Sequence, residues 1–190
     1  MLKRKELLAF SLPESWVSTR AFSGPQYEWA WASELLVDQL FALERDRAAL
    51  FKEFIKGGAI GVFLRGETEW ISYAWMMKPG SMGPPHLPRK IRKQPNYWIC
   101  YCRTKSAYQG RGAYKQNLYH LADRARSINP KADVFIDTEV GNVASQKGIL
   151  KVGFVPHGRI RTIAFSIPCL GTVTFGKWDK KYRHSELKAT

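Results

Sequence analysis

The sequence predicts a mixed α/β fold of the α+β type, with one mostly antiparallel sheet and a central parallel pair of strands. Two observations carry this prediction. The hydrophobic period changes from helical spacing before residue 57 to strand-like runs from residue 59 onward. A strand, a helix and a second strand then follow one another over residues 97–138. This order favours a right-handed parallel crossover, with antiparallel strands on either side of it.

Two helices are expected in the first part of the chain. Residues 27–46 contain no Gly or Pro and carry four leucines at helical spacing: Leu35, Leu36, Leu40 and Leu43. Residues 47–56 continue the pattern with Ala49, Leu50, Phe54 and Ile55 on one side, and Gly57-Gly58 supplies the stop.

A β-hairpin is expected over residues 59–77, because two runs rich in β-branched and aromatic residues flank a turn at 65–68. A long irregular connection follows at 78–96, with five prolines, two glycines and the basic cluster Arg89-Lys90-Ile91-Arg92-Lys93. Structureless connections of this length are uncommon in compact domains and are usually functional or flexible.

The remaining elements are predicted from hydrophobic periodicity and from the Gly, Pro and Asn residues that mark the ends of helices and strands. They are a strand at 97–104, a helix at 113–127, a strand at 132–138, a helix at 142–152 that Asn142 caps, and strands near 158–167 and 171–178. We expect a single domain over residues 1–180 and a polar tail at 181–190.

Charge is distributed unevenly along the 190 residues. The chain has 30 Lys and Arg against 16 Asp and Glu, and the whole excess lies in residues 58–190, with 22 basic and eight acidic side chains. This asymmetry indicates an anionic partner, or alternatively a solvated basic face. Three cysteines give neither a disulfide framework nor a metal-ligand set. With no membrane span and no secretory signal in the sequence, we expect a cytoplasmic protein.

A glycine-containing loop, Tyr108-Gln109-Gly110-Arg111-Gly112-Ala113-Tyr114, lies between the end of a strand and the start of a helix. Free N–H groups at a helix start and the helix dipole attract anions, and glycines let an anion approach the backbone. The segment therefore predicts a phosphate cradle, although two glycines could also serve only a tight turn. The dinucleotide G-x-G-x-x-G pattern fails at Lys115, and the Walker pattern is absent.

Two motifs together resemble the GNAT-type N-acetyltransferase superfamily. Its acyl-CoA loop reads Gln/Arg-x-x-Gly-x-Gly/Ala, and the Gln109 to Ala113 stretch matches all but the last place, which Tyr114 occupies. About thirty residues downstream, Asn142-Val-Ala-Ser145 followed by Lys151-Val-Gly153-Phe154 is similar to the superfamily's Asn-x-x-Ala/Ser and Lys-x-Gly-Phe helix. The order of elements over 59–178 matches as well.

The resemblance implies acetyl-CoA as co-substrate and direct transfer of its acetyl group to a primary amine. It implies that strand 97–104 splays from strand 132–138 and that the pantetheine arm lies along Cys102, Arg103 and Thr104. The pyrophosphate would lie on the amides of Gln109, Gly110, Arg111, Gly112, Ala113 and Tyr114. Asn142 would contact the cofactor, or would only cap its helix.

The catalytic groups are less clear from the sequence. Where many members of the superfamily carry a Tyr that protonates the leaving thiolate, this chain has Ile149. Tyr114, Tyr101 or Tyr108 could replace it. Asp137 and Glu139 are the candidates for the base that takes the amine proton, or they cap the next turn. Cys102 is a poor nucleophile, because no group is placed by sequence to activate it.

The acceptor cannot be read from the sequence: an amino sugar, a small amine and a protein amino group all fit, and the charge favours an anionic one. Two alternatives stay open. One is a nucleic-acid-binding or RNA-modifying protein, which the basic charge and abundant aromatics would suit. The other is a catalytically silent acyl-CoA-binding module, which Ile149 suggests. His120 and His157 are further titratable candidates, each more typical of a structural histidine.

Overall fold

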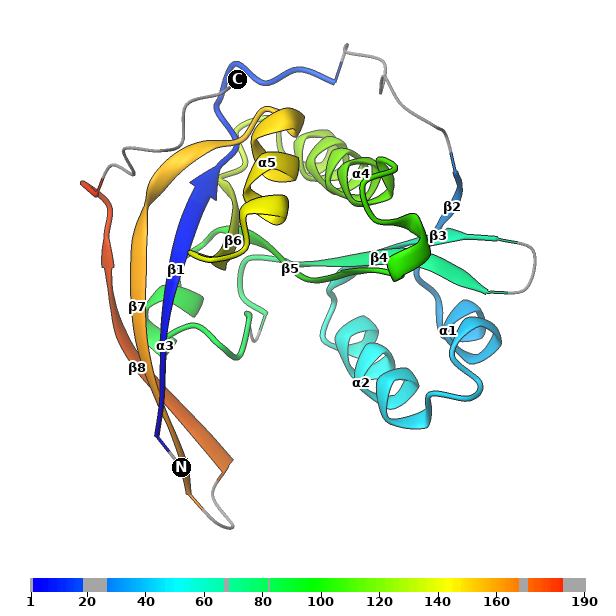
Figure 1. The fold of residues 1–190 in the computed structure, drawn as a ribbon, viewed down its shortest axis with the longest axis horizontal. Coiled ribbons are helices and arrows are strands. Elements are labelled where there is room, and N and C mark those ends of the chain that lie inside the picture. The colour runs from blue at the N-terminus through cyan, green and yellow to red at the C-terminus, as the bar shows by residue number, and fades with distance from the viewer. Residues whose placement is uncertain (1, 19–26, 67–68, 82, 168–170, 183–190) are drawn as a thin grey trace.

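The structure, a computed structural model, describes residues 2–18, 27–66, 69–81, 83–167 and 171–182. Within these residues one sheet has the strand order β2-β3-β4-β5-β6-β1-β7-β8 (Figure 1). Its strands are β1 (Leu2–Ser11), β2 (Glu28–Trp31), β3 (Ile60–Arg65), β4 (Trp70–Met77), β5 (Tyr97–Thr104), β6 (Val134–Glu139), β7 (Val155–Ile167) and β8 (Gly171–Asp179). The helices are α1 (Glu34–Leu40), α2 (Arg45–Lys56), α3 (Arg89–Arg92), α4 (Ala113–Ile128) and α5 (Val143–Val152). No helix of the described residues is long and apolar enough to cross a membrane.

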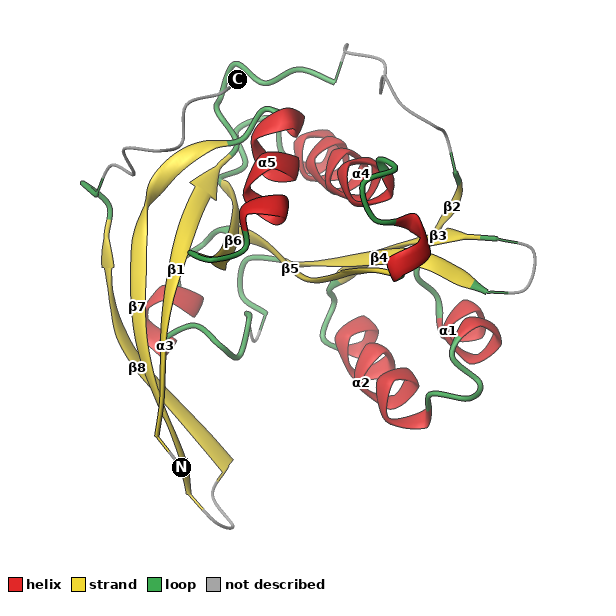
Figure 2. Cartoon of the chain, in the orientation of Figure 1, coloured by secondary structure: helices red, strands yellow, loops and turns green. Residues whose placement is uncertain are grey.

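The sheet is mostly antiparallel, and of its neighbouring strands only β5 and β6 run parallel. This confirms the fold class that the sequence predicts. Helices α4 and α5 cover one face, and α1 and α2 lie against the other (Figure 2). We call these the α4–α5 face and the α1–α2 face. The loop before α3 and α3 itself lie on the α1–α2 face.

The two faces are built by the alternation of side chains along the central strands. Trp75 of β4 and Phe135 of β6 belong to the core on the α1–α2 face. Their neighbours Ala74 and Ile136 belong to the core under α4 and α5. Because both faces are covered, the centre of the sheet is buried on both sides, as is usual where a parallel pair is present.

The parallel pair of strands separates after three residues. Tyr97 to Ile99 of β5 pair with Val134 to Ile136 of β6, and the ladder ends there. We call this end of the ladder the fork, and Cys100 and Asp137 are the first residues beyond it. On its other side β5 bulges, because Trp75 faces Cys100 while Tyr73 faces Arg103. Tyr101, inside the bulge, has a φ of 50°, a left-handed conformation uncommon for a residue with a side chain. The predicted splay is confirmed.

Most elements lie where the sequence predicts them, including the hairpin strands β3 and β4, the strands β5 and β6, and the helices α4 and α5. Residues 67 and 68 of the predicted hairpin turn, and the polar tail from 183, lie outside the described residues. The connection 78–96 is irregular, as expected, except for the single turn of helix α3.

The helix expected over residues 27–46 is wrong at both ends. Glu28–Trp31 forms the edge strand β2, in which Trp29 faces Leu64 and Trp31 faces Val62. Ser33 then starts α1, because its side chain accepts a hydrogen bond from the N–H of Leu36. The helix ends at Leu40, so Leu43 belongs to no helix and is 99% exposed.

The sequence analysis also missed β1, the first strand. Leu2–Ser11 lies between β6 and β7 and pairs with both in antiparallel fashion. Only its second half is buried, from Leu7 to Phe10, while the charged first half is exposed. The core residues of this strand are therefore too few to form a recognisable pattern beside Lys3, Arg4 and Lys5.

Candidate functional site

Residues 109–114, which we call the glycine cradle, connect β5 to the start of α4. Gly110 and Gly112 have φ angles of 74° and 90°, which residues with a Cβ rarely adopt. The first backbone bond of α4 runs from the N–H of Gln116 to the carbonyl of Gly112. The N–H groups of Ala113 and Tyr114 therefore have no acceptor within the helix, and Gly112 has no side chain to cap them. Together with the helix dipole, these amides can bind an anion.

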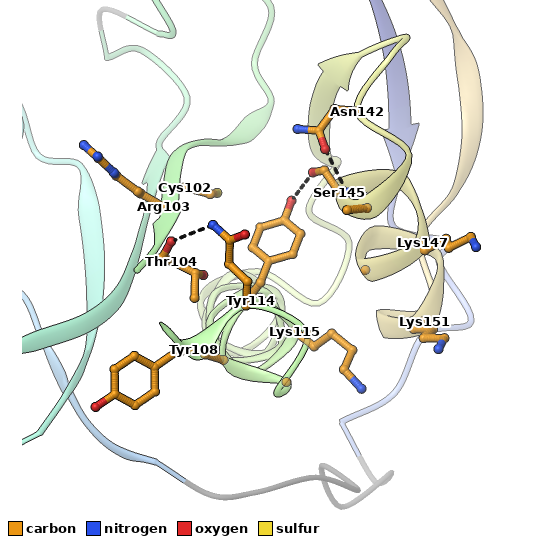
Figure 3. A pocket seen from close by; sticks show the side chains of 16 residues that line it. Cys102, Arg103, Thr104, Tyr108, Tyr114, Lys115, Asn142, Ser145, Lys147 and Lys151 are labelled. Carbon is orange, nitrogen blue, oxygen red and sulfur yellow. Dashed lines mark hydrogen bonds between the residues drawn. The ribbon is translucent and has the colours of Figure 1, made fainter. Parts of the chain in front are cut away.

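Beyond the fork, residues 100–104 of β5 no longer pair with β6, and we call them the free half of β5. A cavity of about 390 Å³ opens between this free half, the glycine cradle and α5 (Figure 3). The structure brings together nine of the ten residues that the resemblance implies for cofactor binding: Cys102, Arg103, Thr104, Gln109, Gly110, Gly112, Ala113, Tyr114 and Asn142. Arg111 is exposed and is not among the lining residues; its carbonyl accepts a hydrogen bond from the Tyr27 hydroxyl. Asn142 also caps α5, because its side chain accepts from the N–H of Ser145 at 3.1 Å.

Lysines form one wall of this cavity. Lys147 and Lys151 line it from α5, and Lys115 lines it from the first turn of α4. The sequence analysis named Lys151 only as part of the Lys-x-Gly-Phe motif and did not name Lys147. Their spacing of four residues, which places both on one face of a helix, is the signal that could have found them. The wall makes the cavity suitable for a ligand with several phosphates.

Tyr114 projects from the first turn of α4 toward α5, and its hydroxyl lies 2.9 Å from the hydroxyl of Ser145 (Figure 3). Gly148 leaves room for the ring: a Cβ at that position would lie 2.8 Å from Cδ1 of Tyr114. Burial raises the pKa of Tyr114 well above its ordinary value, although the bond to Ser145 acts in the opposite direction. Tyr114 therefore remains protonated at neutral pH. Ile149 is fully buried in the core.

The other two tyrosines considered as acids lie differently. Tyr101 packs against Phe54 of α2, with 4.8 Å between ring centroids, on the α1–α2 face. Tyr108 lines the cavity but packs edge-on against Tyr27. Of the three, only Tyr114 has its hydroxyl bonded to a residue of α5, between the two helices.

The thiols near the fork are unsuited to nucleophilic chemistry. Burial raises the pKa of both Cys100 and Cys102 far above the ordinary value, and the charge of Asp137 acts in the same direction. Because the thiolate is the nucleophile, both groups are inert at neutral pH. This agrees with the expectation that Cys102 is a poor nucleophile.

A buried polar network holds the free half of β5. The hydroxyl of Ser72 in β4 donates to the carbonyl of Arg103 at 3.0 Å and lies 2.7 Å from the hydroxyl of Thr104. Asn117 of α4 donates to the same Ser72 oxygen at 2.7 Å. Ser72 and Asn117 are fully buried. The network fixes Arg103 and Thr104 where β6 no longer supports them, and sequence reasoning missed it because its members come from three elements.

A second hollow of about 680 Å³ lies beside β5 and the hairpin. It shares Cys102, Arg103, Thr104, Tyr108 and Gln109 with the cavity just described, and its further walls carry charged side chains: Glu44, Arg47, Glu69 and Lys105. The free half of β5 and the start of the glycine cradle therefore border two hollows.

The two carboxylates predicted as bases have different surroundings. Asp137, only 5% exposed, accepts a hydrogen bond from the indole N–H of Trp98 at 2.6 Å and faces Nε2 of His86 at 3.0 Å. Glu139 is more than half exposed and pairs with Lys5 of β1. The contacts of both side chains are thus with Trp98, His86 and Lys5 rather than with the turn that follows β6.

His86 is the functional candidate that sequence reasoning missed entirely. It lies in the connection before α3, 51 residues from Asp137 in the chain, so no local pattern links the two. The two histidines that the sequence did raise have structural surroundings. His120 stacks on Trp29, and desolvation by burial lowers its pKa. His157 lies 3.1 Å from the Ser11 hydroxyl and packs against Phe135 and Trp178.

The chain resembles known proteins in its structure but not in its sequence. No family model matches the chain, and no curated protein matches it. An acetyltransferase of the GNAT family from Colwellia psychrerythraea superposes with a TM-score of 0.61 at 14% identity, over 86% of this chain and 56% of that one. A GCN5-related N-acetyltransferase-like protein from Streptococcus suis gives 0.58 at 12% identity, over 85% and 61%.

A smaller protein matches as well. The aminoglycoside N-acetyltransferase AAC(6')-Iy, in complex with CoA, superposes with a TM-score of 0.51 at 15% identity, over 67% of this chain and 91% of that one. The chain thus spans less than two thirds of the length of the first two structures. The chain has the GNAT fold, and the resemblance drawn from the two motifs is confirmed at that level.

Proposed function

We propose that the protein is an acyl-CoA-dependent N-acetyltransferase that transfers the acetyl group of acetyl-CoA directly to a primary amine. The observation that carries the proposal is the fork between β5 and β6, which opens beside a glycine cradle at the start of α4. An extended thiol-bearing arm with a pyrophosphate at its far end fits a strand edge that leads to a helix N-terminus.

The residues present fit acyl-CoA in three respects. Apart from its two neighbours in the chain, a Cβ built on Gly110 would meet no atom of the described residues within 4 Å, so the backbone there is open to a ligand. The amides of Ala113 and Tyr114 have no acceptor within the helix and would hold the pyrophosphate. Tyr101 and Cys102 have no partner in the ladders of β4 and β6, so this stretch of β5 is available to the pantetheine arm.

Acetyl transfer to an amine requires three groups: an amide that stabilises the oxyanion, a general acid and a base. A backbone amide of the β5 bulge would stabilise the oxyanion that develops on the thioester carbonyl. Tyr114, which like any tyrosine carries its hydroxyl proton at neutral pH, would give that proton to the leaving sulfur in place of the tyrosine that Ile149 replaces. General acid help of this kind is worth about 10²–10⁴-fold in rate. We assign removal of the amine proton to a base at the end of β6 beside the fork, where Asp137 lies together with His86.

We propose that the acceptor approaches on the α1–α2 face and that the basic residues of the connection 84–96 attract an anionic acceptor. Arg89, Lys90 and Lys93 are exposed, and none of them lines the cofactor cavity. Replacing these three by Gln should raise the Michaelis constant for such an acceptor and flatten its dependence on salt, because charge screening acts over about 8 Å at physiological salt.

The test is release of CoA thiol from acetyl-CoA in the presence of amine panels that represent amino sugars, polyamines, aminoglycosides and peptide N-termini, with and without phosphate groups. The expected result is acceptor-dependent release that Tyr114→Phe slows by about 10²-fold or more. Acetyl-CoA binding without transfer to any amine would indicate the silent acyl-CoA-binding module instead. Failure to bind acetyl-CoA, together with binding of RNA, would favour the nucleic-acid alternative.

A further inference from the structure

The pair formed by His86 and Asp137 lies at the fork, on the opposite face of the sheet from Tyr114. Asp137 directly follows Ile136, the last residue of β6 in the parallel ladder. Its side chain and that of Phe135 point to the α1–α2 face, where Trp98 belongs to the core. The connection that carries His86 packs on this face through Leu87 and Ile91 (Figure 1). The pair thus lies where a group emerging from the fork would meet the α1–α2 face.

The hydrogen bonds of this pair fix the tautomer of the neutral imidazole. Oδ1 of Asp137 accepts from the Trp98 indole at 2.6 Å, and both carboxylate oxygens lie within 3.1 Å of Nε2 of His86. Because a carboxylate only accepts, Nε2 must carry the proton. In the neutral ring Nδ1 then holds the free lone pair. Among the described residues, Nδ1 has no hydrogen-bonding partner.

The two side chains of the pair differ in their exposure to solvent, and this difference gives them different roles. The side chain of Asp137 is 5% exposed and engaged on both oxygens, so it cannot reach an incoming amine itself. The side chain of His86 is 36% exposed. The buried carboxylate therefore orients an accessible imidazole, which is the arrangement that presents a base to a substrate.

Resting on the proposed function, we propose that His86 is the general base of the transfer and that Asp137 and Trp98 position it. The acceptor ammonium gives one proton to Nδ1 of His86. The nitrogen lone pair forms the C–N bond with the thioester carbon, and the C–S bond breaks with both electrons on sulfur. The thiolate takes a proton from Tyr114. The second nitrogen proton leaves to solvent water and Tyr114 regains a proton from solvent, so the products are the acetamide, CoA thiol and protonated His86.

The first experiment needs no acceptor. Imidazole nitrogen resonances of the full chain are recorded by NMR with and without acetyl-CoA, and His86→Gln assigns the His86 signals. We expect protonated Nε2 and unprotonated Nδ1 in the neutral ring, loss of that preference in Asp137→Asn, and a shift at His86 but not at His120 on addition of acetyl-CoA. Protonation at Nδ1, or an unmoved His86 while calorimetry shows acetyl-CoA bound, would overturn the assignment.

The second experiment measures turnover with a protonated alkyl amine and with hydroxylamine, which is already neutral at pH 7. His86→Ala should lower kcat with the alkyl amine by about 10²–10⁴-fold, the usual worth of a general base. Its affinity for acetyl-CoA should be unchanged, its rate with hydroxylamine should fall far less, and added imidazole should restore part of the loss. His120→Ala is the matched control and should behave as wild type.

The outcomes separate the two proposals. If wild type transfers to neither probe, the proposed function fails and the base fails with it. If wild type transfers and His86→Ala keeps its rate with the alkyl amine, only the base is wrong. If His86→Ala lowers the rate equally with both amines, and His86→Gln does the same without rescue by imidazole, His86 has a structural role and the proposal is refuted.

Discussion

At the scale of single residues, Gly148 decides how closely α5 approaches the start of α4. A Cβ at this position would lie 2.8 and 2.9 Å from two ring carbons of Tyr114, closer than such contacts allow. In an exposed helix interior, Gly→Ala usually stabilises by about 1 kcal/mol. Here we expect Gly148→Ala to destabilise by about 1–3 kcal/mol, the usual effect of overpacking.

The measurement is the free energy of unfolding in urea, in wild-type and Tyr114→Ala backgrounds. Removal of the ring should convert the effect of Gly148→Ala from destabilising to neutral or stabilising. If Gly148→Ala stabilises the chain while Tyr114 is present, the ring does not lie against α5 as described.

The two thiols near the fork give a prediction about pH. Because burial raises the pKa of Cys100 and Cys102, little thiolate forms at pH 8, whereas an ordinary thiol with a pKa of ~8.5 is partly ionised there. Iodoacetamide should alkylate both at least about 100-fold more slowly in the native chain than in urea, since each pKa unit lowers the thiolate fraction about tenfold. Peptide mass spectrometry measures each site separately.

The same pKa shifts link stability to pH. Above about pH 8.5 the unfolded chain releases thiol protons that the native chain keeps, so the free energy of unfolding should fall as the pH rises. Cys100→Ala with Cys102→Ala should reduce that slope. Rapid native alkylation at both sites would show that the thiols are not buried.

From the residues alone, the candidate site could be predicted only where its residues are neighbours in the chain, and the resemblance to the superfamily added Asn142 and the end of β5. Gln109 to Tyr114 form one segment, so the sequence pattern shows their arrangement directly. His86 and Asp137 meet only because the connection before α3 folds onto the α1–α2 face. The network of Ser72, Thr104 and Asn117 likewise forms between separate elements, and polar residues of these common types carry no local signal.

At the scale of elements, α5 presents Lys147 and Lys151 to the cavity. CoA carries a 3′-phosphate that dephospho-CoA lacks, and hydrogen bonds to charged groups contribute about 1.5–3 kcal/mol each. Lys147→Gln with Lys151→Gln should therefore weaken CoA binding by about tenfold or more and leave dephospho-CoA binding almost unchanged. Arg89→Gln, Lys90→Gln and Lys93→Gln, in and beside α3, serve as the control and should affect neither ligand.

Equal loss for both ligands would mean that α5 holds the pyrophosphate rather than the 3′-phosphate. Loss in the α3 control would contradict the separation between the basic connection and the cofactor cavity.

Edge elements were harder to predict than central ones. Residues 28–31 alternate Glu, Trp, Ala and Trp, a pattern that a short edge strand and an amphipathic helix share. The tertiary pairing of β2 with β3 decides between them. Strands β3 and β4 are buried on both faces and almost wholly apolar, and β6 begins with a buried apolar run, Val134 to Ile136. These strands were predicted correctly.

At the scale of the whole molecule, the fork lies where two parts of the sheet meet. Strands β2 to β5 form one part, and β6, β1, β7 and β8 form the other. Three residue pairs of β5 and β6 join them. Strand β1 holds the second part together, although its partners β6 and β7 are far along the chain. Only four of its residues, Leu7 to Phe10, are buried, which is why no local pattern in residues 2–11 predicted the strand.

The central claim, that the cavity beside the fork binds acyl-CoA through the glycine cradle, is tested most directly by calorimetric titration of acetyl-CoA. Gly110 and Gly80 have φ angles of 74° and 81°, and a Cβ on either would meet no atom of the described residues within 4 Å apart from its two neighbours in the chain. A valine side chain at each position therefore imposes similar backbone strain, but only the one introduced by Gly110→Val projects into the cradle. Gly110→Val should weaken acetyl-CoA binding by about tenfold or more, equivalent to about 1.4 kcal/mol, while Gly80→Val binds as wild type. Equal affinity of all three folded proteins, or no binding by wild type, would contradict the account.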